Sequence, residues 1–200
     1  MGQRLVVTIK NGDRRLCNIY YHWGAYTYRA LYQTKKIVDC IYNHADESEK
    51  ELLLRLIHFC EENGGGIANG FGSEEWKYIQ KLYPNETFKK SGISRNDGLI
   101  ALSEKGMAES QSWSEGDVII DLDKYQINNG VYAGYEFLEE YNECRAEWDD
   151  DFEELTLEDI PDIGYDLGYI DIDDIDAVIA ALREVDGVCR YGNEIYELTE

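Results

Sequence analysis

A run of carboxylates in the second half of this chain constrains its fold more than any other feature of the sequence. Residues 147–176 read EWDDDFEELTLEDIPDIGYDLGYIDIDDID and contain fourteen Asp and Glu side chains but neither Lys nor Arg. Ionised carboxylates are costly to bury without partners, so the run must lie on a surface. Trp148, Phe152 and Tyr165 interleave with the acids, whereas acidic disordered tails are poor in aromatic residues. We therefore expect a folded, strongly acidic surface.

The net negative charge of the chain comes entirely from its second half. Residues 1–100 hold 14 basic and 12 acidic side chains, residues 101–200 hold 5 basic and 29 acidic ones, and the formal net charge is −22. Such an acidic half repels nucleic acid and anionic membranes, and it attracts basic partners at long range. The change in charge predicts a near-neutral lobe at 1–95 and an acidic lobe at 96–200.

The composition is that of a folded protein, with 44% hydrophobic and 12% aromatic residues. The five cysteines are scattered without a CxxC pair, which favours a reducing compartment over a disulfide framework. No apolar stretch is long enough for a signal peptide or a membrane-spanning helix. We expect a cytoplasmic protein that does not bind membranes.

Local patterns in the first half predict a hairpin and three helices. Asn11-Gly12 separates two β-rich runs within residues 4–21, which is typical of a tight hairpin turn. Ser48 and Glu51 have the spacing of a capping box at the start of a second helix, before the glycines at 64–66. A third helix is expected within residues 74–83. The expected buried faces are Tyr28, Leu31, Val38, Ile41 and Tyr42 in the first helix, and Leu53, Leu56, Ile57 and Cys60 in the second.

The second half changes period. The runs GLIALS, MAESQSW and DVIIDL predict a short β-meander at 98–122, and Asn129-Gly130 predicts a further turn. A last helix would bury one face, and a hairpin would close the chain. The sequence as a whole predicts an α+β fold in which antiparallel hairpins and a short β-meander pack with about four to five helices. The expected face of the last helix consists of Ile172, Ile175, Val178, Ile179, Leu182 and Val185.

Calcium and phosphate motifs are incomplete in this sequence. An EF-hand loop needs oxygen ligands at its first, third and fifth positions and glycine at its sixth. A loop starting at Asp171 has Asp176 at the glycine position, and one starting at Asp121 has Gln126 there. The stretch GGGIANGFG at 64–72 follows a helix and lacks the Lys of a phosphate-binding loop, so we expect a flexible connection between helices.

Zinc binding and nucleophilic catalysis are also disfavoured. His58 and Cys60 would point about 200° apart around a helix, so they cannot join Cys40 and His44 at one metal ion. His58 is expected beside Glu62 in a structural role. A Cys17–His22 dyad would require the loop after a strand to fold back. We expect no metal, no cofactor and no catalytic site, so the protein is not expected to be an enzyme.

The acidic run has the charge density of a nucleic acid. At about 1.5 Å per helical residue, thirty residues would place one carboxylate every ~3 Å. A DNA strand carries one phosphate per ~3.4 Å of its axis. Pro161, Gly164 and Gly168 prevent a single straight helix, so the comparison concerns density and not shape. Such a surface would suit a protein cleft that binds phosphates.

The stretches EWDDDFEEL and YIDIDDID, within residues 136–176, resemble those of phage-encoded anti-CRISPR and anti-restriction proteins that mimic nucleic acid. NIYYHWGAY resembles a stretch found in proteins of Gram-positive bacteria and their phages. The resemblance implies an inhibitor in a bacterial host cell that occupies the basic channel of a Cas9-type effector or another nucleic-acid-binding defence nuclease. It would not bind nucleic acid directly. Many small mimics are acidic throughout, so the near-neutral first lobe would instead hold a non-basic surface or form a homodimer.

Two other functions fit the same charges. One is an immunity protein or antitoxin that neutralises a basic toxin, and the other is a metal-dependent phosphoryl-transfer enzyme in which several Asp residues bind Mg²⁺. In the inhibitor hypothesis the partner-binding residues are Glu147, Trp148, Asp149, Asp150, Asp151, Glu153, Glu154, Glu158, Asp159, Asp162, Tyr165, Asp166, Asp171, Asp173, Asp174 and Asp176.

Overall fold

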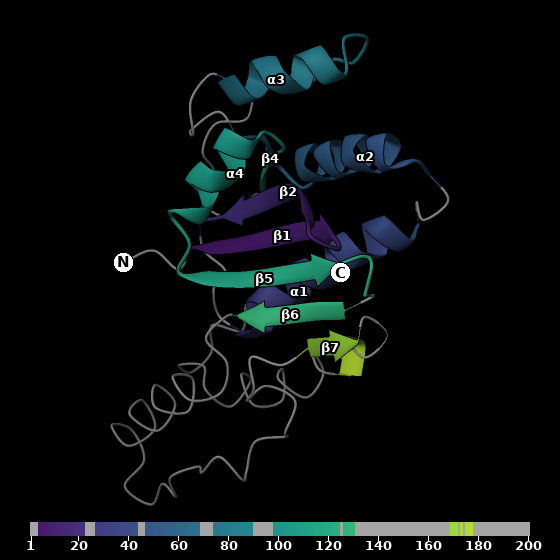
Figure 1. The fold of residues 1–200 in the computed structure, drawn as a ribbon, viewed down its shortest axis with the longest axis vertical. Coiled ribbons are helices and arrows are strands. Elements are labelled where there is room, and N and C mark those ends of the chain that lie inside the picture. The colour runs from purple at the N-terminus through teal and green to yellow at the C-terminus, as the bar shows by residue number, and fades with distance from the viewer. Residues whose placement is uncertain are drawn as a thin grey trace, which may run out of the picture.

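The fold is α+β, as the sequence predicts (Figure 1). In the computed structural model of the chain, the described residues are 4–22, 27–43, 47–68, 74–89, 98–124, 126–130, 169–171, 173 and 175–177. No helix among them is long and apolar enough to cross a membrane. The elements are β1 (Leu5–Asn11), β2 (Arg14–Tyr21), α1 (Thr27–Tyr42), α2 (Glu49–Glu62), β3 (Gly66–Ile67), α3 (Glu74–Leu82), β4 (Leu99–Ala101), α4 (Glu104–Gln111), β5 (Gly116–Asp121), β6 (Gln126–Gly130) and β7 (Tyr169–Asp171).

These strands form one mixed sheet in the order β3-β4-β2-β1-β5-β6-β7. β1 and β2 make the predicted antiparallel hairpin, and Gly12 adopts the positive φ of 60° that a tight turn after Asn11 favours. At the centre of the sheet, β1 runs parallel to β5, with Leu5 opposite Gly116. β6 and β7 add two antiparallel strands at one edge.

The sheet crosses the expected lobe boundary between residues 95 and 96. β4 and β5 follow that boundary, yet they pair with β2 and β1, which precede it. The described strands of both halves therefore share one sheet, and the change in charge along the sequence marks no break in that sheet.

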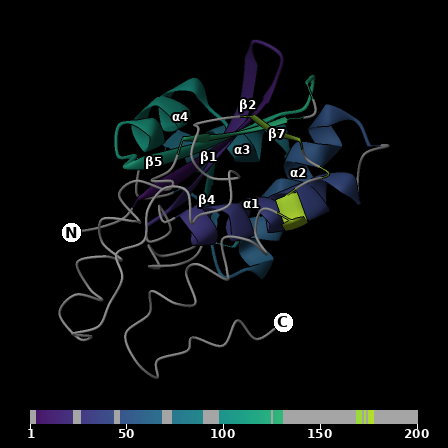
Figure 2. The same cartoon turned by 90° about the horizontal axis from the view of Figure 1, so that it is seen from below.

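Helices pack on both faces of the sheet. α1 and α2 cover one face and bury the larger core, to which β1 contributes Leu5, Val7 and Ile9. α4 covers part of the opposite face, where Val6 and Tyr20 lie in a smaller core. Figure 2 shows α1 and α2 on one side of the strands and α4 on the other. Alternation of side chains along each strand produces this division.

The second helix begins as predicted. The Ser48 hydroxyl accepts a hydrogen bond from the Glu51 amide, and the Glu51 carboxylate accepts one from the Ser48 amide, which completes the capping box. Its buried residues are Leu52, Leu56, Ile57 and Cys60. Leu53, which was predicted for this stripe, is only partly buried beside them.

The predicted β-meander is wrong in its middle run, because most of MAESQSW belongs to the helix α4. The Ser103 hydroxyl caps this helix by accepting a hydrogen bond from the Gly106 amide at 3.0 Å. A Cβ at Gly106 would overlap the carboxylate of Glu75 in α3, so glycine allows the two helices to meet. In the sheet, β2 and β1 lie between β4 and β5, so β4 and β5 are not neighbours as a meander would require. Asn129-Gly130 lies within β6 and does not form the predicted turn.

The glycine-rich stretch after α2 is not the expected flexible connection. It contributes β3, which runs parallel to β4, with Gly66 opposite Leu99. The Gly66 amide donates to the Gly98 carbonyl at 3.0 Å, and a Cβ at Gly65 would overlap that same carbonyl oxygen. The glycines therefore serve close backbone approach at this end of the sheet. Residues 69–72 of the stretch lie outside the described residues.

Candidate partner-binding surface

A strongly acidic part of the sequence connects two strands that are neighbours in the sheet. We call residues 131–168, which follow β6 and precede β7, the acidic segment; its 38 residues include fourteen Asp and Glu and a single Arg. β6 and β7 are antiparallel, with Asn128 opposite Tyr169 and Gln126 opposite Asp171. The two strands that flank the segment therefore lie side by side at one edge of the sheet (Figure 1).

Most of the predicted partner-binding residues belong to this segment. Asp171, Asp173 and Asp176 are described by the structure. The other thirteen lie outside the described residues: Glu147, Trp148, Asp149, Asp150, Asp151, Glu153, Glu154, Glu158, Asp159, Asp162, Tyr165, Asp166 and Asp174. Their role in binding stays a prediction.

Asp173 and Asp176 contact the first helix. The Tyr42 hydroxyl donates a hydrogen bond to the Asp173 carboxylate at 3.0 Å. The Lys35 ammonium lies 3.1 Å from the Asp176 carboxylate. Between the two acids, Ile175 is only 3% exposed and belongs to the larger core. Ile175 is thus buried as predicted for the last helix, whereas Ile172, Val178, Ile179, Leu182 and Val185 lie outside the described residues.

Sequence patterns did not identify Lys35 and Tyr42 as contacts of the acidic run. Tyr42 was predicted to be buried, but it is 42% exposed and uses its hydroxyl at the surface. No local pattern marks this contact, because Lys35 and Tyr42 are seven residues apart, about 10.5 Å along a helix, whereas Asp173 and Asp176 are only three apart.

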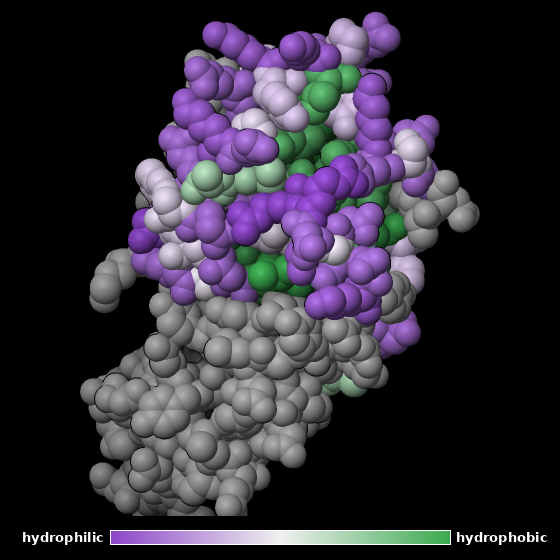
Figure 3. Space-filling view, in the orientation of Figure 1, coloured by the Kyte–Doolittle hydropathy of each residue, from purple (hydrophilic) through white to green (hydrophobic). Residues whose placement is uncertain are grey.

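The residues that the structure describes are together much closer to neutrality than the acidic segment. The described ranges contain fourteen basic and nineteen acidic residues. On the face shown in Figure 3, hydrophilic side chains cover most of the described surface, and hydrophobic ones appear between them in smaller patches.

Strand β5 carries one buried carboxylate, Asp121, and the ammonium group of Lys10 lies 3.0 Å from it. Burial raises the pKa of Asp121, but Lys10 and the hydrogen bonds from the backbone amides of Lys124 and Asp123 together outweigh this effect, so the pKa is below its usual value.

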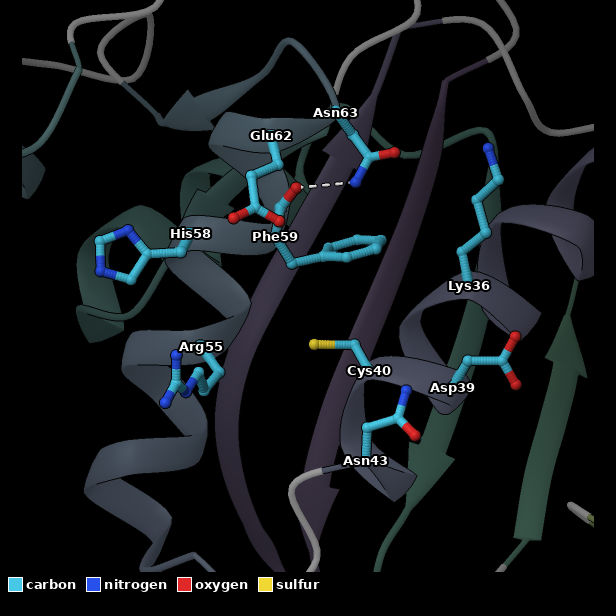
Figure 4. A pocket seen from close by; sticks show the side chains of 9 residues that line it. All are labelled: Lys36, Asp39, Cys40, Asn43, Arg55, His58, Phe59, Glu62 and Asn63. Carbon is cyan, nitrogen blue, oxygen red and sulfur yellow. Dashed lines mark hydrogen bonds between the residues drawn. The ribbon is translucent and has the colours of Figure 1, made fainter. Parts of the chain in front are cut away.

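A groove of about 470 Å³ lies between α1 and α2 (Figure 4). Phe59 of α2 and Cys40 of α1 point into the space between the helices. Burial raises the pKa of the Cys40 thiol to about 11, so the thiol stays protonated near neutral pH and is a poor nucleophile. The remaining lining residues mix both charges with amides, and they are Lys36, Asp39, Asn43, Arg55, His58, Glu62 and Asn63. The groove therefore offers a polar recess without an activated nucleophile.

The Cys17–His22 dyad is incompatible with the sheet. Cys17 is fully buried in the core under α1 and α2. Tyr20 lies in the core on the opposite face, and its hydroxyl is 2.9 Å from Nδ1 of His22. The two members of the dyad are consequently on different sides of β2. Burial also raises the pKa of Cys17 far above its usual value.

The residues considered for zinc binding do not converge. Cys60 is 1% exposed in the core, whereas His58 lines the groove and has its Nδ1 3.1 Å from the Glu61 carboxylate. The carboxylates recorded within 4 Å of His58 are thus those of Glu61 and Glu86, and not that of the predicted Glu62. His44 lies outside the described residues. Within the described part of the chain, no group of three or more His, Cys, Asp or Glu side chains could hold a metal ion.

We expect a chelator to leave the melting temperature unchanged within about one degree. A structural metal contributes folding free energy, so its removal would lower the melting temperature by many degrees. Thermal unfolding followed by circular dichroism, with and without EDTA, measures this difference. A clear loss of stability in EDTA would contradict the prediction and direct attention to Cys40, His44 and His58.

Comparison of the chain with protein-family models, with curated proteins and with solved structures finds no match.

Proposed function

We propose that this chain is a non-enzymatic inhibitor that binds a basic, nucleic-acid-binding protein through its acidic segment and thereby excludes nucleic acid. The partner implied by the resemblance of residues 136–176 is a defence nuclease of the bacterial cytoplasm, such as a Cas9-type effector or a restriction enzyme. One observation carries the proposal. The acidic segment, with a net charge of −13, joins two neighbouring strands at one edge of the sheet, whereas the described residues are much closer to charge balance, with fourteen basic and nineteen acidic side chains.

This arrangement has a physical advantage over charge spread across the whole surface. A protein channel that binds phosphates gains affinity because the bound polyanion releases condensed counterions. A dense set of carboxylates at one edge can gain from the same effect, and it also orients the approaching inhibitor. The described sheet and helices, which we call the scaffold, are closer to charge balance and add little attraction in other orientations. The acidic edge should therefore meet the basic channel first.

The test measures inhibition of target-DNA cleavage by a guide-loaded Cas9-type effector over a range of salt concentrations. We expect inhibition to weaken as salt rises, because the Debye length falls to about 8 Å at physiological ionic strength. Changing Asp149→Lys, Asp150→Lys and Asp151→Lys together should weaken inhibition by about tenfold or more. Single changes should have small effects, since an exposed ion pair contributes only ~0–1 kcal/mol.

A matched control reverses three exposed acids outside the acidic segment: Asp13→Lys, Glu62→Lys and Asp123→Lys. Asp123 lies beyond the opposite end of β5 from the pair Asp117–Gly130, and Asp13 is in the neighbouring hairpin turn. The acids at the start of α2 are unsuitable controls, because Glu49 pairs with Arg14 and Glu51 closes the capping box. Equal losses in both triple variants, or inhibition that does not respond to salt, would overturn the proposal.

A further inference from the structure

The described residues immediately after the acidic segment make contacts of a different kind from those expected of a partner-binding surface. Asp173 accepts a hydrogen bond from Tyr42, and Asp176 pairs with Lys35. Both acids were predicted to contact the partner. Instead, their carboxylates have partners on α1 within the same chain.

Apolar and backbone contacts hold the same stretch. Strand β7 pairs with β6 through Tyr169, Ile170 and Asp171. Ile175, four residues after the end of β7, is buried to 97% in the core that α1 and α2 share with the sheet. The stretch from Tyr169 to Asp176 therefore makes three kinds of contact with the scaffold: a strand ladder, a buried side chain and two polar contacts to α1.

Lys35 is suited to binding the Asp176 carboxylate because its ammonium group remains charged. Partial burial lowers its pKa, but hydrogen bonds to Asp39 and Asp176 outweigh this effect and place the pKa above its usual value. Asp39 lies one helical turn from Lys35, with an oxygen 3.1 Å from the ammonium group. The Asp39 carboxylate holds the ammonium group close to the surface of its own helix, and Asp176 contacts it there.

We infer that Asp173 and Asp176 are positioning residues. Together with Ile175, they fix the residues that follow the acidic segment to α1, where Lys35 binds Asp176. The inference rests on the proposed function and divides its surface. In the proposed function the acids of residues 131–168 bind the partner, whereas Asp173, Ile175 and Asp176 contact the rest of the chain.

The variant Lys35→Glu separates positioning from simple attraction. It makes the protein more acidic by two charges, so attraction alone would strengthen inhibition of the guide-loaded Cas9-type effector. Positioning has the opposite effect, because a released segment loses its fixed orientation. We expect inhibition to weaken by roughly fivefold, and amide hydrogen exchange at 169–177 in the free protein to accelerate by a similar factor. The charge-swapped variant Lys35→Glu with Asp176→Lys should restore both.

Lys36→Glu is the matched control, because it makes the same charge change on the same helix but lines the groove instead. It should leave exchange at 169–177 unchanged and should not weaken inhibition. If Lys35→Glu and Lys36→Glu have the same effect on exchange and on inhibition, the positioning role is wrong while the proposed function stands. If reversal of Asp149, Asp150 and Asp151 leaves inhibition intact, the proposed function falls, and exchange at 169–177 still decides whether Lys35 anchors this stretch.

Discussion

Replacing residues 131–168 with a short Gly-Ser linker should give a folded protein that no longer inhibits the proposed nuclease partner. The replacement removes fourteen acidic residues and one Arg from the chain. Because most of the charge that attracts a basic channel is then gone, we expect inhibition to fall below detection, at least about a hundredfold. The measurement is the same DNA-cleavage assay, with amide hydrogen exchange of β1 and β5 as the check of folding.

The sheet should tolerate this change. Asn128 and Tyr169 already face each other across β6 and β7, so a short linker can join the two strands. Shortening a connection from about 40 residues to about 4 lowers the entropic cost of closing it by about 2 kcal/mol. The expected stability of the shortened protein is therefore equal to that of the full chain or higher.

A second variant keeps the chain length and changes every Asp and Glu of residues 131–168 to Asn and Gln. It should lose inhibition in the same way, because it removes the charge and keeps the connection. Inhibition by both variants at the level of the full chain would show that the scaffold, and not the acidic segment, binds the partner. Loss in the shortened protein alone would assign binding to the shape of the segment and would contradict the electrostatic mechanism.

The largest loss of stability is expected for Glu75→Ala. Glu75 is only 2% exposed, and its Oε1 accepts hydrogen bonds from the amides of Leu102 at 2.6 Å and Ser103 at 3.0 Å. Its other oxygen accepts one from the Ser103 hydroxyl. Alanine would leave these donors without their acceptor at the start of α4. We expect a loss of about 3 kcal/mol or more in the free energy of unfolding, measured by urea denaturation.

Glu74→Ala is the natural control for this variant. Glu74 is the preceding residue and pairs with Lys105, but both side chains are more than two-thirds exposed. Its loss should cost less than about 1 kcal/mol. Glu75→Gln should fall between the two, since an amide oxygen can still accept from the backbone amides. A cost for Glu75→Ala no larger than that for Glu74→Ala would show that water replaces the lost acceptor.

Sequence patterns identified the elements whose signals are local. The Asn11-Gly12 turn, the Ser48–Glu51 box and the third helix all depend on residues close together in the chain. The α4 helix was missed because its run alternates briefly like a strand, although Ser103 provides a cap. β3 was missed because its glycines suggest a flexible connection, and their purpose is visible only when Gly98 lies against Gly65.

The candidate surface was predictable in composition but not in layout. The charge of residues 147–176 is evident in the sequence, and so is the need for apolar anchors such as Ile175. The sequence does not show that β6 and β7 are neighbours, because strand pairing depends on contacts that no local pattern encodes. For the same reason, it does not distinguish Asp173 and Asp176, which contact α1, from acids that remain available to a partner.

The parallel pairing of β1 with β5 sets an order for the folding of this chain. The β1–β2 hairpin can form within microseconds, since its partners are close in sequence. The centre of the sheet must wait for residues 116–121, which lie 111 positions after their partners in β1 and carry a high cost of chain closure. During synthesis, the ribosome would release the acidic residues only after β5. The centre of the sheet can then assemble before the acidic residues are present. Their mutual repulsion therefore need not slow this assembly.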